Sequence, residues 1–130
     1  MRFVRGVFLA AGMYGLLLCG SLMFAEGLIG TMTPPALTHP EYFYGFLSIT
    51  AMFQILFLLI AKDPLRYRSL MPLAMTEKWA YMLVLALLFA LQRLPASVLI
   101  FGLIDALLGV LFLVAFLKLP ARTLSEQPVL

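Results

Sequence analysis

The stretch Leu94–Leu117, LPASVLIFGLIDALLGVLFLVAFL, decides the fold class of this chain. It runs for 24 residues with Asp105 as its one charged side chain. A helix rises about 1.5 Å per residue, so about 20 apolar residues cross a hydrocarbon core of about 30 Å. The stretch is therefore long and apolar enough to form a membrane-spanning helix.

Three further segments have the same character. Gly6–Ala25 and Tyr42–Ala61 each contain 20 residues without a charge, and Trp79–Gln92 contains 14. Because 14 residues reach only about 21 Å, we expect this helix to begin earlier, near Pro72, since proline suits the first turn of a helix. The sequence predicts an all-α transmembrane four-helix antiparallel bundle. It forms one domain, 1–130, with spans at about 6–29, 42–61, 72–92 and 96–117 and a short tail, 118–130.

Composition supports the same class. Of the 130 residues, 64% are hydrophobic and 12% are charged, whereas soluble domains are about 45–50% apolar and about 25% charged. A chain of this size cannot hide so much apolar surface from water. The composition excludes a disordered chain, and the single Cys19 excludes a disulfide scaffold. The chain has no basic stripe, so we predict the lipid bilayer as its partner and no nucleic acid.

Lys and Arg residues predict the orientation of the helices. Eight of the nine fall on the side that holds both termini, and Arg93 alone falls on the other. The eight are Arg2, Arg5, Lys62, Arg66, Arg68, Lys78, Lys118 and Arg122. The positive-inside rule therefore predicts a multi-pass protein of the bacterial inner membrane with both termini cytoplasmic. We expect Arg66 and Arg68 to contact anionic lipid headgroups.

Asp105 is the main candidate for a functional group inside the membrane. An ionisable side chain in a spanning helix costs about 2.5–3.5 kcal/mol on insertion scales. Gly102 and Gly109 share its helix face, and small residues permit close helix approach, so we expect Asp105 to point into the bundle.

Gln54 and Tyr14 lie at a similar depth in the first two spans, which predicts one polar layer of Tyr14, Gln54 and Asp105. Away from water, a carboxyl group favours its neutral, hydrogen-bonding form unless a cation lies nearby. Two interpretations stay open. In one, Asp105 joins helices by donating to Gln54 or to a backbone carbonyl; in the other, it handles a ligand or a proton.

Glu26 is a second candidate, at the outer end of the first span. It shares a helix face with three small residues: Ala11, Gly15 and Cys19. These small residues predict a packing groove. Glu26 is then either a solvent-exposed carboxylate at the rim of this groove, or it lies at the entrance of an outward-facing pocket together with His39 and Glu41. One histidine and two acids from a loop are a poor ligand set, and we predict no metal site.

Glu77 is the third candidate, with Lys78 beside it and Tyr81 one turn later. We expect Thr76, Glu77 and Lys78 to lie in the interfacial turns, where the helix dipole favours an acid at the helix start. The alternative is that Glu77 faces inward and forms a hydrogen bond with Tyr81.

No catalytic or cofactor motif stands out. A single histidine cannot provide bis-histidine haem ligation, and the chain has no Cys-x-x-Cys-His motif. It has no phosphate-binding glycine loop, His-Glu-x-x-His motif or Ser/His/Asp set. We therefore predict no cofactor, assign no catalytic residue and favour a protein that is not an enzyme.

The segment Lys62–Pro72, KDPLRYRSLMP, followed by Glu77-Lys78, resembles a pattern in small bacterial four-helix membrane proteins. In these, D-P-x-R-x-R-x-L precedes an E-K pair at the start of the third helix. His39–Phe46, HPEYFYGF, also fits. Those proteins are similar in size and topology to the DoxX-like group. The resemblance covers about 40–117 and implies a four-helix bundle. Its motifs are not catalytic signatures, and DoxX-like members are mostly assigned by association with membrane redox systems.

Three functions follow as hypotheses. The first is a non-enzymatic membrane module or accessory subunit that packs with itself or with a larger membrane complex, as its small-residue faces suggest. The second is a binder or enzyme for a lipophilic molecule such as a quinone, an isoprenoid or a sterol-like lipid. Asp105, Gln54 and Tyr14 would contact the polar end of that molecule, with Glu77 or Glu26 at the entrance. The third is an oligomeric transporter, since four helices enclose little space.

Overall fold

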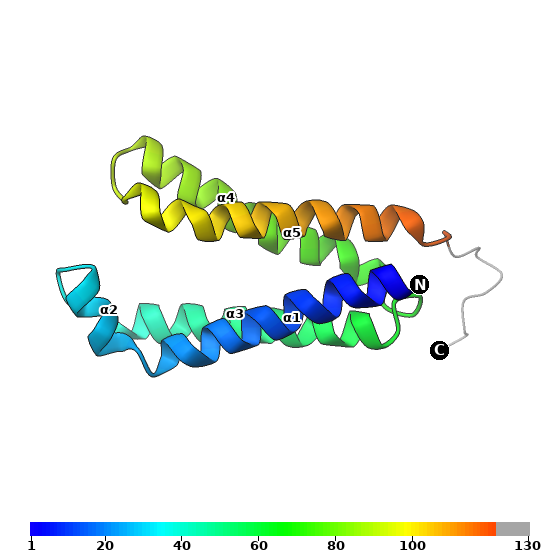
Figure 1. Cartoon of the computed structure of the whole chain (residues 1–130), viewed down its shortest axis with the longest axis horizontal. Coiled ribbons are helices and arrows are strands. Elements are labelled where there is room, and N and C mark those ends of the chain that lie inside the picture. Colours follow the sequence, from blue (N-terminus) through cyan, green and yellow to red (C-terminus); the bar gives the residue numbers. More distant parts are fainter. Residues whose placement is uncertain (122–130) are drawn as a thin grey trace.

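The computed structural model describes residues 1–121, which form five α-helices and no strand. The helices are α1 (Arg2–Met23), α2 (Glu26–Met32), α3 (Pro40–Lys62), α4 (Met71–Ala90) and α5 (Leu99–Lys118). Short 3-10 turns, Arg68–Leu70 and Ala96–Val98, lead into α4 and α5. The helices α1, α3, α4 and α5 are long and apolar enough to cross a membrane and run antiparallel in sequence order (Figure 1). The all-α four-helix membrane bundle is therefore confirmed.

The first span differs from its predicted bounds of 6–29. α1 begins at Arg2 and ends at Met23, and a separate short helix, α2, begins at Glu26. An acidic residue in a first turn interacts favourably with the helix dipole, so Glu26 starts a new helix rather than continuing α1. As predicted, α4 carries Pro72 in its first turn. The residues 122–130 of the predicted tail lie outside the described part of the chain.

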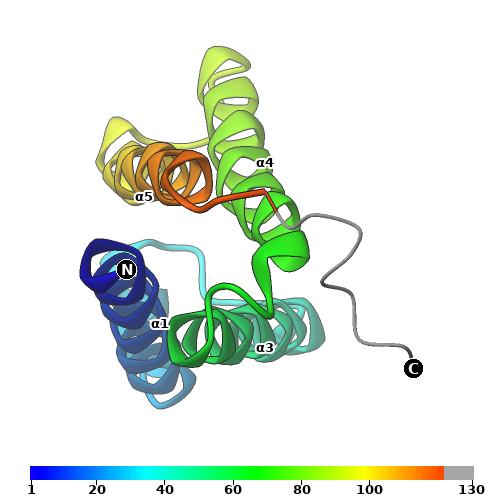
Figure 2. The same cartoon turned by 90° about the vertical axis from the view of Figure 1, so that its right-hand side faces the viewer.

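Two helical hairpins make up the bundle. α1 packs mainly on α3 and α4 mainly on α5, with smaller contacts of α1 with α5 and of α3 with α4 (Figure 2). The short connection between α4 and α5, which includes Arg93, Leu94 and Pro95, makes these two spans neighbours in space. Glycines allow the close approach within each hairpin. A Cβ atom at Gly12 would lie 2.7 Å from Leu58 Cδ2 of α3, and one at Gly102 would lie 2.9 Å from Met82 Sδ of α4.

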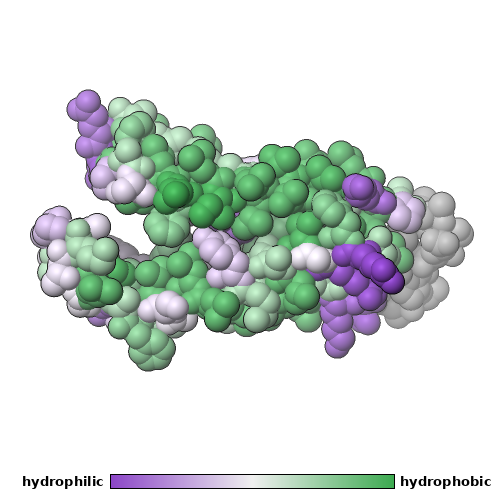
Figure 3. Space-filling model, viewed as in Figure 1, coloured by the Kyte–Doolittle hydropathy of each residue, from purple (hydrophilic) through white to green (hydrophobic). Residues whose placement is uncertain are grey.

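The two ends of the bundle differ in charge. The N-terminus, the α3–α4 connection and the end of α5 lie together at what we call the basic end (Figure 1). α2 and the α4–α5 connection lie at the opposite end, the α2 end. Hydrophilic surface gathers near the two ends, with hydrophobic surface between them (Figure 3). This distribution is the one expected of a membrane-spanning protein.

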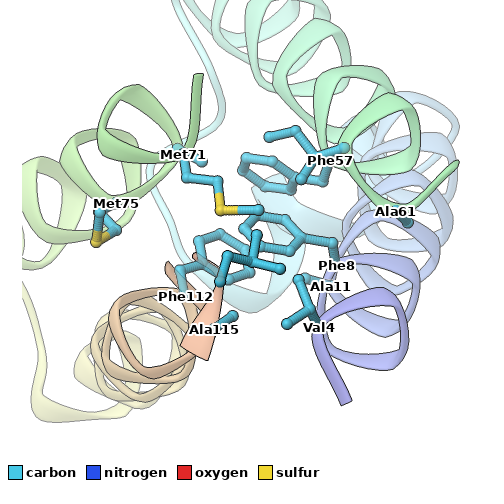
Figure 4. Packing of buried hydrophobic residues seen from close by; sticks show 12 residues of the cluster. Val4, Phe8, Ala11, Phe57, Ala61, Met71, Met75, Phe112 and Ala115 are labelled. Carbon is cyan, nitrogen blue, oxygen red and sulfur yellow. The ribbon is translucent and has the colours of Figure 1, made fainter. Parts of the chain in front are cut away.

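The core that joins the hairpins lies at the basic end. The ring of Phe8 from α1 stacks on Phe112 from α5 with centroids 4.3 Å apart, and Phe57 from α3 meets Phe112 edge-on at 5.0 Å. Met71 of α4 reaches towards these rings, so all four spans contribute (Figure 4).

Towards the α2 end the two hairpins diverge. All the residues of the core cluster come from the basic-end halves of their helices: Val4, Phe8 and Ala11; Phe57, Ile60 and Ala61; Met71, Ala74 and Met75; Phe112, Ala115 and Leu119. Figure 3 shows a notch between the hairpins at the α2 end, which we call the opening. Weakly hydrophilic side chains lie where it narrows (Figure 3).

Candidate functional site

Three charged side chains meet inside the spanning part of the bundle. Lys78 Nζ of α4 lies 3.2 Å from Asp105 Oδ1 of α5 and donates a hydrogen bond to it. The same Nζ atom lies 3.3 Å from Glu77 Oε2. The exposed fractions of the Lys78, Asp105 and Glu77 side chains are only 4%, 13% and 16%. We call these three residues the charged cluster.

Helix periodicity explains why Lys78 is inside. Met71, Ala74 and Met75 are buried on the inner face of α4, and Lys78 follows Met71 by seven residues and Ala74 by four. Residues at these spacings share a helix face, so the face that carries the core also carries Lys78 inward. Lys78, which we expected in an interfacial turn, therefore faces the interior of the bundle.

Glycines on α5 bring Asp105 to its partner. Gly102 and Gly109 are buried on the same helix face as Asp105. A Cβ atom at Gly109 would clash with the indole of Trp79, and one at Gly102 would crowd Met82. Without side chains at these two positions α5 approaches α4 closely, and Asp105 meets the residue beside Trp79, which is Lys78. The prediction that Asp105 points into the bundle is confirmed, although its partner lies on α4.

The charged cluster contains more negative than positive charge. With all three groups ionised, two carboxylates surround one ammonium group and leave a net charge of −1. Glu77 Oε2 is buried, and its contact with Lys78 lacks the geometry of a hydrogen bond. An unbalanced charge away from water is costly. The cluster therefore favours a bound proton or a further positive charge.

Lys78 also touches the second span. Its Nζ atom lies 5.3 Å from the ring centroid of Phe57 on α3, within the range of a cation–π contact. Phe57 belongs to the aromatic core, so the charged cluster lies directly on the α2-end side of that core. The aromatic rings separate the cluster from the basic end of the bundle.

Gln54 lies one helical turn from Phe57 and is fully buried. Its Nε2 atom donates to Thr50 O of its own helix at 3.0 Å, and its Oε1 atom has no hydrogen-bond partner. The amide packs against Gly15 of α1, where a Cβ atom would clash with it. The predicted hydrogen bond between Asp105 and Gln54 is therefore not formed, because Asp105 pairs with Lys78 and Gln54 turns to its own backbone.

Tyr14, Tyr81 and Cys19 surround the charged cluster at a greater distance. Both tyrosines are partly buried, and the charge of Asp105 acts on their hydroxyl groups. The buried thiol of Cys19 on α1 experiences all three charges of the cluster. Glu77 forms no hydrogen bond with Tyr81, because its carboxylate turns to Lys78. Among the described residues, Tyr14 forms no hydrogen bond with Asp105, which bonds Lys78 instead.

Glu26 lies away from this region at the α2 end. Tyr44 Oη of α3 donates to Glu26 Oε2 at 2.7 Å, while His39 Nδ1 and Glu41 Oε1 lie 3.2 Å apart and are exposed. Among the described residues, no group of three or more His, Cys, Asp or Glu side chains is placed to hold a metal ion. Glu26 therefore joins α2 to the start of α3.

The two arginines of the α3–α4 connection have different surroundings. Arg66 is exposed and its guanidinium lies 5.6 Å from the ring centroid of Tyr67. Arg68 is partly buried, and its guanidinium lies 4.0 Å from the ring centroid of Phe116 on α5. Arg66 is thus free to reach headgroups, whereas Arg68 joins the start of α4 to the end of α5.

Sequence reasoning missed the pairing of Lys78. The spacing of Lys78 from Met71 and Ala74 places the three residues on one helix face, which indicates that Lys78 faces inward. Its position near the start of the predicted span favoured the interface instead. No family model, curated protein or solved structure matches the chain. The resemblance to DoxX-like proteins therefore stays a prediction.

Proposed function

We propose that the protein binds a lipophilic small molecule within the membrane. The polar end of this molecule lies at the charged cluster, and its apolar body lies in the opening between the hairpins. The observation that carries the proposal is the trio Glu77, Lys78 and Asp105, which is buried in the spanning part of the bundle with one carboxylate in excess.

A purely structural role does not account for this composition. One lysine and one aspartate suffice to join α4 to α5, and replacing a buried ion pair by apolar side chains is often neutral or stabilising. The second carboxylate, Glu77, lies 3.3 Å from the same ammonium group without hydrogen-bond geometry, and it adds repulsion with Asp105. Ionisable groups inside membranes mark ligand and ion sites by default, and the cluster fits that role better than the role of a helix link.

The packing of the glycines against other helices of the same chain weakens the case for a self-associating module. That hypothesis rested on small-residue faces, but Gly12 and Gly15 contact α3, and Gly102 and Gly109 contact α4. These faces pack within the chain rather than against a partner. The hairpins also separate at the α2 end (Figure 3), which leaves room for the body of a ligand above the aromatic core.

The distribution of charge supports an orientation for this site. We infer that the basic end lies on the cytoplasmic side of a bacterial inner membrane, since six of its described residues are Lys or Arg and the α2 end has Arg93 alone. The six are Arg2, Arg5, Lys62, Arg66, Arg68 and Lys118. The opening then faces the outer leaflet, and the aromatic core closes the cytoplasmic side.

Native mass spectrometry of the protein extracted from its own membranes tests the proposal. The wild-type chain should carry one bound molecule that the variant Glu77→Gln/Asp105→Asn has lost. A Glu41→Gln variant removes an exposed carboxylate at the α2 end and should retain it. Bare protein, or the same bulk phospholipids on all three chains, would refute ligand binding at the cluster.

A further inference from the structure

The charged cluster also indicates what kind of polar group it accepts. We infer that the ligand is an amphiphile with a protonated amine, and that this ammonium group takes the place of a proton on the cluster. The inference rests on the proposed function and adds the chemical class of the ligand to it.

The first argument is charge. The cluster carries −1 when Glu77, Lys78 and Asp105 are all ionised, and Coulomb interactions are strong where water is excluded. An ammonium group brings this charge to zero. A carboxylate or phosphate group would raise it to −2 or beyond, and a quinone or an alcohol would leave it unchanged. Among these head groups, only the ammonium group can replace a proton in balancing the charge of the cluster.

The second argument is the supply of hydrogen bonds. Glu77 Oε2 is a buried acceptor without a hydrogen-bond donor. A buried polar atom without a partner destabilises the protein. Lys78 has three N–H groups and gives one hydrogen bond to Asp105. A ligand that supplies donors therefore suits this region, and an ammonium group has up to three.

The third argument is the lining of the region. Phe57 lies 5.3 Å from the Lys78 ammonium group, and Tyr14 and Tyr81 lie within the field of Asp105. Aromatic faces attract cations more strongly when water is absent. The aromatic face of Phe57 at the charged cluster thus favours a cationic head over an anionic one, while the apolar opening accepts a hydrocarbon tail.

Proton balance links binding to pH. Neutrality of the empty site requires one proton on Glu77 or Asp105, because the fully ionised cluster carries a charge of −1. When an ammonium ligand enters, this proton leaves for water and the cluster stays neutral overall. The titratable groups facing the site are Tyr14 and Cys19 of α1, Glu77, Lys78 and Tyr81 of α4, and Asp105 of α5. The α3 residues nearest to the cluster, Gln54 and Phe57, do not titrate.

Four twelve-carbon probes separate the alternatives: dodecylamine, dodecyltrimethylammonium, dodecanol and laurate. Each is titrated into the full-length protein in nanodiscs of neutral lipid, with empty nanodiscs as the partition blank. Dodecylamine should bind about tenfold or more tightly than dodecanol, which corresponds to about 1.4 kcal/mol, and laurate should bind most weakly. Dodecyltrimethylammonium has charge without N–H donors and should fall between dodecylamine and dodecanol.

Two further readouts make the test specific. The affinity for dodecyltrimethylammonium, which cannot lose a proton, should rise by about tenfold per pH unit until the cluster is ionised. The variant Glu77→Gln/Asp105→Asn leaves Lys78 as the one charge of the cluster, so it should bind dodecylamine no more tightly than dodecanol, while Glu41→Gln should behave as wild type.

Other results would overturn the inference in different ways. Equal binding of dodecanol and dodecylamine, or tighter binding of laurate, would refute an ammonium ligand while the proposed membrane site stands. If none of the four probes binds and native mass spectrometry finds no bound molecule, the proposed function itself fails.

Discussion

Lys78 on α4 and Asp105 on α5 form an ion pair of 3.2 Å within the membrane-spanning part of the protein. The pair lies on the α2-end side of the aromatic core, since the Lys78 ammonium group is 5.3 Å from the ring of Phe57. The ion pair therefore lies in the region where the two hairpins begin to separate. The stability of the bundle and its proposed activity therefore depend on the same residues.

Lys78→Met should destabilise the protein more than removal of the whole charged cluster. The single change leaves two carboxyl groups without their cation, and loss of one partner from a buried pair costs about 3–5 kcal/mol. The triple variant Glu77→Gln/Lys78→Met/Asp105→Asn leaves no charge behind and should lose much less. Unfolding of both variants in detergent gives the free energies. A triple variant as unstable as Lys78→Met would show that the ion pair itself, rather than the unpaired carboxylates, governs stability.

Gly15→Ala should push α1 away from α3. A Cβ atom at this position clashes with the side chain of Gln54, and overpacking of this kind costs about 1–3 kcal/mol. Gly20→Ala is the matched control on the same helix, because a Cβ atom there meets nothing within 4 Å. It should be neutral or stabilising by up to about 1 kcal/mol, since alanine favours helix.

The clash at Gly15 can be checked with a second change. Gln54→Ala removes the side chain that the new methyl group meets, so Gly15→Ala should cost less in that background than in the wild-type chain. Thermal unfolding of the four chains in this double-mutant cycle measures the coupling. Additive effects would contradict a direct contact between the two residues.

Phe8→Ala should separate the hairpins at the basic end. Phe8 is completely buried, and its ring stacks on that of Phe112 with centroids 4.3 Å apart. Large-to-small changes of buried aromatic residues cost about 3–5 kcal/mol. Phe24→Ala alters a side chain that is 94% exposed and should change little. Equal losses of unfolding free energy for the two variants would argue against an aromatic core at this end.

Gln92→Gly should stabilise the end of α4. Gln92 has a φ angle of 57°, and the amide of Arg93 donates to Leu88 O at 2.8 Å. This is a helix end that favours glycine, and a left-handed conformation costs other residues about 1–2 kcal/mol. Gln92→Val should instead lower the melting temperature, because a branched Cβ is poorly tolerated there. A lower melting temperature for Gln92→Gly would contradict this geometry.

The fold was predictable because apolar length and charge placement act locally. The charge-free segments predicted four spans. Pro72 predicted an early start for α4, which begins at Met71. The break after Met23 was missed, because residues 24–29 are no less apolar than α1 apart from Glu26. Apolar length alone cannot tell a continuous helix from two successive ones.

The site was only partly predictable because it depends on which helices are neighbours. Depth along each span placed Asp105 near Tyr14 and Gln54, and helix periodicity turned Asp105 inward. Depth alone did not reveal that Lys78 on α4 turns inward to meet Asp105 on α5. Asp105 therefore pairs with Lys78, and Gln54 bonds to the backbone of its own helix. The contacts at Gly102 and Gly109 that fix this pairing appear only in three dimensions.

Photolabelling provides the most direct test of a ligand site between the hairpins. Dodecylamine and dodecanol that carry a diazirine at the chain end should label partly buried residues of the α2-end halves of the helices, such as Leu18 and Leu22 of α1 and Leu88 of α4. Excess unlabelled probe should suppress this labelling. Label confined to lipid-facing residues such as Leu17, Leu83 and Leu103, which are 67%, 69% and 59% exposed, and unaffected by competitor, would contradict a binding site in the opening.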